Sequence, residues 1–182
     1  MQTKAFLTKT SKLVLTSMIA CLIVLVIFLI RIPVPFTQGY LNLGNGVMFI
    51  GVMILGRRNG ALAAAVGSML GDILGGFAMW APWSFFINGG LAVIMALVLS
   101  AFSHVKMSDA GRWICRIMAM AAGGLFMVFG YFIGEGVMYG NWAIAALGVP
   151  WNIGQFAVGI VLACVVLAAL MKTQVIKKDG TL

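Results

Sequence analysis

Long apolar runs separated by short polar or basic segments constrain the fold of this chain more than any other feature. The chain has 182 residues, of which 63% are hydrophobic and only 9% are charged. A soluble domain of this length has about 25% charged residues and still exposes much of its surface, so it could not hide this many apolar side chains from water. The apolar residues must therefore face lipid, and the sequence predicts an all-α integral membrane protein.

The lengths of the apolar runs predict how often the chain crosses the membrane. A helix that spans the bilayer requires roughly 20 predominantly apolar residues. By this criterion we expect a single transmembrane domain over residues 1–182, folded as a six-helix bundle. The expected spans cover approximately residues 12–32, 43–55, 60–79, 84–105, 113–139 and 151–171. The second span is short, and the topology depends on it.

The basic residues are distributed asymmetrically between the two sides of such a bundle. With six spans both termini lie on one side, and Arg31 is then the only lysine or arginine on the other. Short loops rich in lysine and arginine remain in the cytoplasm, so both termini are expected to be cytoplasmic. We therefore interpret the net charge of +8 as a signal of topology and not of nucleic-acid binding. The basic residues on the terminal side are Lys4, Lys9, Lys12, Arg57, Arg58, Lys106, Arg112, Arg116, Lys172, Lys177 and Lys178.

The opposite, outer side is rich in aromatic and neutral amide side chains. An interfacial aromatic belt with ordinary turn residues explains the aromatic residues but explains less well the amides within predicted helices, such as Asn88, Asn152 and Gln155. Aromatic rings combined with neutral hydrogen-bonding groups suit a flat, polar, heteroaromatic ligand. A small-molecule binding site is therefore expected on the outer side.

Two ionisable residues within or beside the spans leave their roles open. Asp72 falls in the middle of the third span, where a carboxylate is costly unless it is paired or protonated. We favour a structural hydrogen bond for Asp72, because the ligand is expected nearer the outer surface. Glu135 lies at the outer end of the fifth span and is the better candidate for contacting a ligand. Arg31 could contact the ligand, pair with an acid, or extend to the membrane surface.

Motifs for catalysis, nucleotide binding and metal binding are missing from the sequence. There is no G-x-x-x-x-G-K-[ST] loop, and His104 is the only histidine, which argues against a multi-histidine metal site. The three cysteines form no C-x-x-C pair. We therefore expect no catalytic residues, metal or cofactor. The alternatives to an importer subunit are a self-sufficient secondary carrier or channel, and, less consistent with the sequence, a membrane enzyme or an assembly factor.

An ordered series of short segments carries a resemblance to a known family. These segments are residues 41–45 (LNLGN), 55–61 (LGRRNGA), 67–76 (GSMLGDILGG) and 80–83 (WAPW). Together they resemble the substrate-binding S components of energy-coupling factor (ECF) vitamin transporters. Within that family the chain looks most like the hydroxymethylpyrimidine or pyridoxine-type S components.

The resemblance implies a multi-pass protein of the bacterial plasma membrane that captures a small heteroaromatic vitamin or precursor from outside the cell. It also implies a complex with a transmembrane coupling subunit and two cytoplasmic ATPase subunits, which would hydrolyse the ATP. Family members contact the coupling subunit through a small-x-x-x-small motif on the first helix. Ser17 and Cys21 match these positions, although both depart from the alanine common in the family. The family's ligand contacts point to Gln38, Trp80, Asn88, Glu135, Tyr139, Asn141 and Asn152 as substrate-binding residues.

Overall fold

The computed structural model describes residues 8–33 and 40–173. Within this part of the chain, five helices are long and apolar enough to cross a membrane, which confirms the all-helical membrane fold. The elements in order are α1 (Lys9–Leu29), β1 (Ile32–Pro33), β2 (Tyr40–Leu41), α2 (Gly44–Leu74), α3 (Ala81–Ala101), α4 (Asp109–Tyr139) and α5 (Trp142–Lys172). The two short strands pair antiparallel between α1 and α2.

Helix α2 reverses direction at Gly56. This residue has φ 74° and ψ −174°, a conformation that glycine adopts far more readily than other residues. A Cβ added at Gly60 would lie 2.7 Å from the Cα of Val52, whereas these positions would be about 12 Å apart in a straight helix. Helix α2 therefore consists of two limbs, residues 44–55 and 57–74, packed against each other. The reversal lies between the second and third spans expected from the sequence.

Helix α1 packs against the first limb of α2 in the antiparallel direction. A Cβ added at Gly44 would lie 2.9 Å from Cγ1 of Ile27, and one added at Gly51 would lie 2.8 Å from Cγ2 of Ile19. Residues later in the first limb of α2 therefore contact residues earlier in α1. Glycine permits this close approach of two backbones.

The second limb of α2 runs parallel to α1 and contacts it through the Gly67–Gly71–Gly75 stripe. A Cβ at Gly67 would lie 2.9 Å from the carbonyl oxygen of Ala20, and one at Gly71 would lie 2.9 Å from Cγ2 of Ile27. This stripe therefore packs inside the bundle.

Several helix boundaries differ from those expected, and two of the differences involve proline. Helix α3 begins at Ala81 and not near residue 84, because Pro82 occupies the first turn, where proline is well tolerated. Helix α5 begins at Trp142 and not near residue 151, with Pro150 inside the helix. The sixth span was expected to cover residues 151–171, but membrane helices tolerate an internal proline where neighbouring groups satisfy the freed carbonyl.

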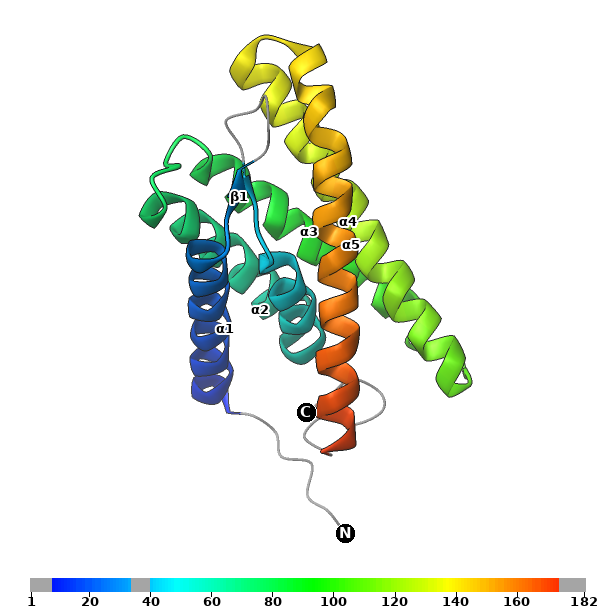
Figure 1. The fold of residues 1–182 in the computed structure, drawn as a ribbon. Helices are drawn as coiled ribbons and strands as arrows, with labels where there is room; N and C mark the ends of the chain where they lie inside the picture. The colour runs from blue at the N-terminus through cyan, green and yellow to red at the C-terminus, as the bar shows by residue number, and fades with distance from the viewer. Residues whose placement is uncertain (1–7, 34–39, 174–182) are drawn as a thin grey trace.

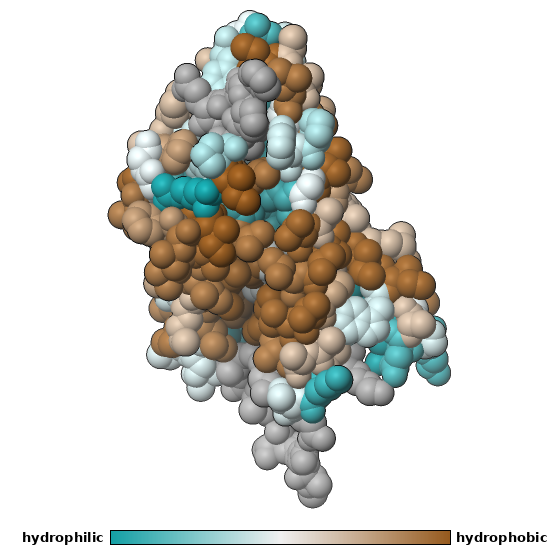
Figure 2. Space-filling view, in the orientation of Figure 1, coloured by the Kyte–Doolittle hydropathy of each residue, from teal (hydrophilic) through white to brown (hydrophobic). Residues whose placement is uncertain are grey.

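The helices form an elongated bundle with an apolar middle. The Lys9 end of α1 and the Lys172 end of α5 lie at the same end of the bundle (Figure 1). Figure 2 shows an apolar belt across the middle of the visible face, with hydrophilic residues along both its upper and its lower edge. Large apolar side chains such as Phe86 and Val165 are 73% and 64% exposed, as expected for surfaces that contact lipid. The core between the helices is formed by Ile23, Phe49, Leu91, Met95, Met120, Met127 and Leu167.

Candidate ligand pocket

A cavity lies among β2 and the five helices. It contains about 560 Å³ of space not filled by atoms, a volume that includes the part open to solvent. Most of its wall is polar or aromatic, which is unusual for the interior of a membrane bundle. The residues that line it are Ile27, Tyr40, Asn42, Ser68, Asp72, Trp80, Ser84, Asn88, Tyr131, Glu135, Gly148, Asn152 and Gln155.

Two buried carboxyl groups lie in the wall of this pocket. Asp72 is 4% exposed and Glu135 is 5% exposed. The hydroxyl of Tyr40 donates a hydrogen bond to Oδ1 of Asp72. Oδ2 of Asp72 and Oε2 of Glu135 have no hydrogen-bond partner among the described residues. None of the described lining residues is a lysine or arginine, and Arg31, which interacts electrostatically with Asp72, lies outside the lining.

The carboxyl group of Glu135 is held where α4 meets α5. A Cβ added at Gly148 of α5 would lie 2.5 Å from Oε2 of Glu135 and 3.0 Å from Oε1. Only a residue without a side chain leaves this space for the carboxyl group. Gly148 therefore contributes to the pocket by permitting the position of Glu135.

Trp80 supplies an aromatic surface and a hydrogen-bond donor. It is 4% exposed, and its indole Nε1 has no hydrogen-bond partner among the described residues. Its ring lies 6.0 Å from the ring of Tyr131 and 6.2 Å from that of Tyr139, in tilted and edge-on arrangements that favour aromatic contacts. A buried indole N–H normally has a partner, so this donor is suited to a bound ligand.

Hydroxyl and amide groups fix the position of Tyr131. Its hydroxyl lies 3.0 Å from Oγ of Ser84 and accepts a hydrogen bond from Nδ2 of Asn88 at 3.1 Å. Oγ of Ser68 donates to the carbonyl oxygen of Ala64 at 2.7 Å and lies 3.1 Å from the carbonyl oxygen of Ser84, so α2 and α3 approach closely there. These hydrogen bonds restrict the rotation of the side chains that form this part of the pocket wall.

A second network of amides connects the start of α2 with α5. Nε2 of Gln155 donates to Oδ1 of Asn45 at 2.7 Å, and the backbone N–H of Asn42 donates to Oε1 of Gln155 at 3.0 Å. Nδ2 of Asn45 lies 2.9 Å from the sulfur of Met127. The side chain of Gln155 thus bridges the segment after β2 and helix α2.

Tyr40 lies outside the membrane-spanning helices and acts as a donor. Burial raises the pKa of its phenol well above the usual range, and the nearby Asp72 carboxylate raises it further. The phenol therefore keeps its proton at physiological pH. This proton is the one that Tyr40 donates to Asp72.

Arg31 does not line the pocket. Its Nε donates to the carbonyl oxygen of Ile27 at 3.0 Å, and its Nη1 donates to the carbonyl oxygen of Gly75 at 2.8 Å. The guanidinium carbon also lies 5.4 Å from the ring centre of Tyr40. Arg31 therefore links the end of α1 to the end of α2, where a cation interacts favourably with the helix carbonyls.

The residues predicted from the resemblance fall into four groups. Four of them line the pocket, namely Trp80, Asn88, Glu135 and Asn152. Tyr139 touches the Trp80 ring but is not among the lining residues. Asn141 is exposed and caps α5, where its Oδ1 accepts hydrogen bonds from the N–H groups of Ala143 at 3.0 Å and Ile144 at 3.3 Å. Gln38 lies outside the described residues.

The set of predicted substrate-binding residues omitted several lining residues, of which Asp72 is the most important. The structure places it in the pocket wall, whereas the sequence favoured a structural role below the ligand. A usable signal was present in the spacing of polar residues. Helical residues four apart share a face, and three such pairs line the pocket. The pairs are Ser68 with Asp72, Ser84 with Asn88, and Tyr131 with Glu135.

The two residues predicted to dock a partner lie elsewhere. Ser17 and Cys21 are exposed on α1. They line a shallow, almost entirely apolar groove together with Leu13, Val14, Leu15, Met18, Ile19, Leu22 and Leu25. This groove is separate from the ligand pocket, because the two share no lining residue.

Comparison with known proteins gives a consistent result. Residues 7–172 match the family described as ECF-type riboflavin transporter, S component. The thiamine precursor transporter HmpT of Lactococcus lactis subsp. cremoris is 30% identical over 149 residues, which cover 81% of this chain and 80% of that protein. A protein of Pyrococcus woesei, described as an uncharacterized protein in the gap 3′ region, is 33% identical over 112 residues, or 62% of this chain and 70% of that protein.

Proposed function

Because this chain belongs to the ECF-type riboflavin transporter S component family, we propose that its ligand is an amine-bearing heteroaromatic vitamin precursor, with hydroxymethylpyrimidine as the best candidate. Family membership confirms the resemblance seen in the sequence. The chain is a transmembrane subunit of an ECF importer that binds a vitamin or vitamin precursor. It is a component of a transporter and a multi-pass protein of the cell membrane, which favours the importer over a self-sufficient carrier.

The observation that carries the ligand proposal is the set of unsatisfied polar atoms in the pocket. Oδ2 of Asp72 and Oε2 of Glu135 can accept hydrogen bonds, and Nε1 of Trp80 can donate one. A hydroxymethylpyrimidine offers the complementary groups: an exocyclic amine and a hydroxyl that donate, and ring nitrogens that accept. A buried polar group without a partner is costly, so a ligand that supplies these partners is favoured.

Riboflavin, which gives the family its description, fits this wall less well. Its fused three-ring system has no exocyclic amine, and the ring itself offers one N–H donor between two carbonyl acceptors. The alignment with the relative described as a thiamine precursor transporter covers four-fifths of each chain, which supports the smaller pyrimidine as the ligand. The aromatic surface of Trp80 suits either ring system, so we expect Asp72 and Glu135 to discriminate between hydroxymethylpyrimidine and riboflavin.

Titration of the purified chain with a panel of vitamins tests this proposal. Trp80 lines the pocket, so quenching of tryptophan fluorescence should report binding of an aromatic ring. We expect saturable quenching by hydroxymethylpyrimidine at submicromolar concentration, equivalent to about −8 kcal/mol or tighter. Pyridoxine, thiamine, riboflavin and pantothenate should bind more weakly. Tightest binding of riboflavin would overturn the choice of substrate while leaving the family assignment intact.

The topology belongs to the same proposal, with six crossings and both termini in the cytoplasm. It is supported by the reversal at Gly56, since the two limbs of α2 then count as two spans. The first limb would be only about 18 Å long, so the bilayer must be locally thin or the limb partly covered by protein. Arg57 and Arg58 at the reversal fall on the same side as Lys9 and Lys172, as the positive-inside rule requires.

The proposal also includes the partners. A transmembrane coupling subunit would dock on the apolar groove of α1 that contains Ser17 and Cys21, and two cytoplasmic ATPase subunits would supply the energy. Both residues are small and exposed, which permits close approach of another helix. The groove is separate from the pocket, so docking and ligand binding can be tested independently.

Replacing Ser17 and Cys21 together with tryptophan should abolish co-purification with the coupling subunit. The bulky rings would fill the groove and hold the partner helix away. Binding of hydroxymethylpyrimidine to the isolated subunit should stay within about twofold of the unaltered protein, a difference of roughly 0.4 kcal/mol. Pull-down from membranes that contain all subunits measures the first effect, and fluorescence titration measures the second.

The matched control is Val165→Trp on α5, whose side chain is 64% exposed and does not line the α1 groove. This variant should assemble normally. If the double variant assembles as well as the control, the docking surface lies elsewhere on the subunit.

A further inference from the structure

We propose that the end of the bundle opposite the pocket binds the headgroup of an anionic phospholipid. The binding site is a groove between the reversal in α2, the end of α3 and the beginning of α4, called here the basic groove. It is independent of the identity of the transported ligand. The residues that line it include Gly56, Arg57, Leu99, Phe102, Arg112 and Arg116.

The basic groove combines cations with apolar walls. Arg57, Arg112 and Arg116 contribute three guanidinium groups from two different helices. Side chains such as Leu99 and Phe102 provide apolar surface beside them. A phospholipid has the same combination, with a phosphate next to acyl chains, and guanidinium groups bind phosphate through paired hydrogen bonds.

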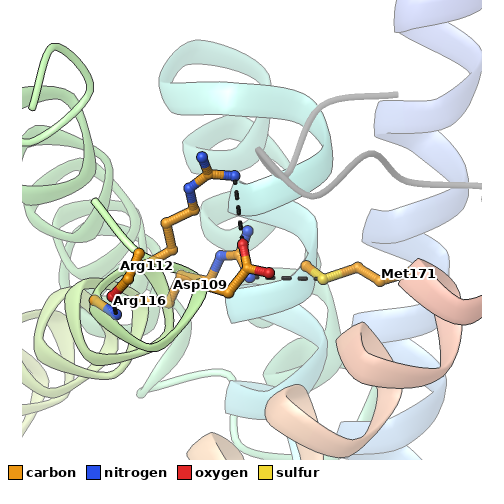
Figure 3. A network of polar contacts seen from close by, with 6 residues as sticks. Asp109, Arg112, Arg116 and Met171 are labelled. Atoms are coloured by element: carbon orange, nitrogen blue, oxygen red, sulfur yellow. Dashed lines mark hydrogen bonds and ion pairs between the residues drawn. The ribbon is translucent and has the colours of Figure 1, made fainter. Parts of the chain in front are cut away.

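The local charge favours an anionic occupant. An adjoining cavity is lined by Asp109, Arg112, Trp113, Arg116 and Lys172 together with Ala168 and Met171. Among the described residues that line either cavity, Asp109 is the only acid, against four basic residues. Asp109 lies 3.9 Å from Nη1 of Arg112, and the two side chains are 64% and 42% exposed, so this ion pair is weak and can open (Figure 3).

Arg116 is fixed at the bottom of the groove. It is only 6% exposed, and its guanidinium carbon lies 5.1 Å from the ring centre of Trp113. Its Nη1 donates to the sulfur of Met171 at 3.6 Å, and Figure 3 shows the side chain directed toward that residue. This arrangement keeps one positive charge within the protein wall, while Arg57 and Arg112 can adjust to a ligand.

The basic groove also lies at the depth in the membrane where phospholipid headgroups are expected. Arg116 and Glu135 lie on the same helix, and the intervening residues correspond to about 28 Å along its axis, close to the thickness of the hydrocarbon core. If the pocket lies toward one face of the bilayer, the groove lies at the other. Basic cavities between helices at the cytoplasmic interface are suited to anionic headgroups.

Native mass spectrometry of the purified chain with phosphatidylglycerol and phosphatidylcholine tests the proposal. The unaltered protein should retain phosphatidylglycerol in preference to phosphatidylcholine. The Arg57→Gln/Arg112→Gln double variant should reduce that preference at least about fivefold, since each arginine–phosphate contact contributes more than a neutral one. Arg116 is left unchanged because it is buried. Ligand binding in the outer pocket, followed by fluorescence, shows that the variant is folded.

The matched control is Arg58→Gln/Lys106→Gln, which removes the same charge from residues that do not line the groove. An equal loss of lipid in the control would overturn the proposal, since only general surface charge would then matter. Displacement of the lipid by millimolar inorganic phosphate would identify a site for free anions instead. If the double variant keeps the lipid but loses the coupling subunit, the groove is a protein contact and the lipid proposal fails.

Discussion

Replacing Glu135 with glutamine should weaken the binding of hydroxymethylpyrimidine at least about tenfold, a loss of roughly 1.5–3 kcal/mol. Glutamine has nearly the same shape but replaces one of the two carboxyl oxygens with an amide nitrogen that only donates, so a hydrogen bond accepted from an amine or hydroxyl of the ligand is lost. Glu135 is buried, and its Oε2 has no hydrogen-bond partner among the described residues. Isothermal titration calorimetry of the purified subunit measures the change directly.

Asp109→Asn is the matched control for this substitution. Asp109 is an exposed acid at the opposite end of α4, paired weakly with Arg112. Its replacement should leave the affinity unchanged. If Glu135→Gln and Asp109→Asn bind equally well, Glu135 does not contact the ligand, and the acceptor must be Asp72.

A second variant changes the position of the Glu135 carboxyl group without replacing Glu135. In Gly148→Ala, the added methyl group would meet the carboxyl oxygens at 2.5 and 3.0 Å, so the carboxyl group must move. The affinity should fall although no charge is removed. Weaker ligand binding by both Glu135→Gln and Gly148→Ala would show that the position of the carboxyl group matters as well as its chemical identity.

The sequence predicts the architecture well because the bilayer imposes one dominant rule. Apolar length and the distribution of lysine and arginine predict helices across the membrane and separate a basic end from a polar one. Gly56, between Leu55 and Arg57, has the residue type that a reversal requires. The boundary at α5 was wrong because Pro150 is accommodated within the helix, an outcome that depends on neighbouring helices.

The pocket could be predicted only in part, because it depends on which helix faces converge. Trp80 and Glu135 were identified from their chemistry and their location near the outer side. Asp72 was assigned a structural role because its depth was judged from sequence position alone. The short β1–β2 pair brings Tyr40 back over Asp72, and no local pattern in the sequence specifies that contact. Asn141, which was predicted to contact the ligand, is exposed and accepts hydrogen bonds from the first N–H groups of α5.

Replacing Gly60 with valine should destabilise the fold by about 1–3 kcal/mol and also weaken ligand binding. The Cβ would lie 2.7 Å from the Cα and 3.2 Å from the amide nitrogen of Val52, and backbone atoms cannot move aside as a flexible side chain can. The two limbs of α2 must therefore separate. Because the second limb carries Asp72, the pocket should lose its geometry as well as its stability. Thermal unfolding in detergent and fluorescence titration measure the two effects.

The comparison that isolates packing is Gly154→Val on α5. Gly154 is exposed, and a Cβ there would meet no atom within 4 Å. Both substitutions place a β-branched residue in a helix, so the intrinsic helix cost is shared and cancels between them. Gly154→Val should unfold within a few degrees of the unaltered protein and bind ligand normally. If Gly60→Val is equally well tolerated, the limbs of α2 are not held together by this contact, and the reversal at Gly56 must be maintained by the packing of each limb against α1.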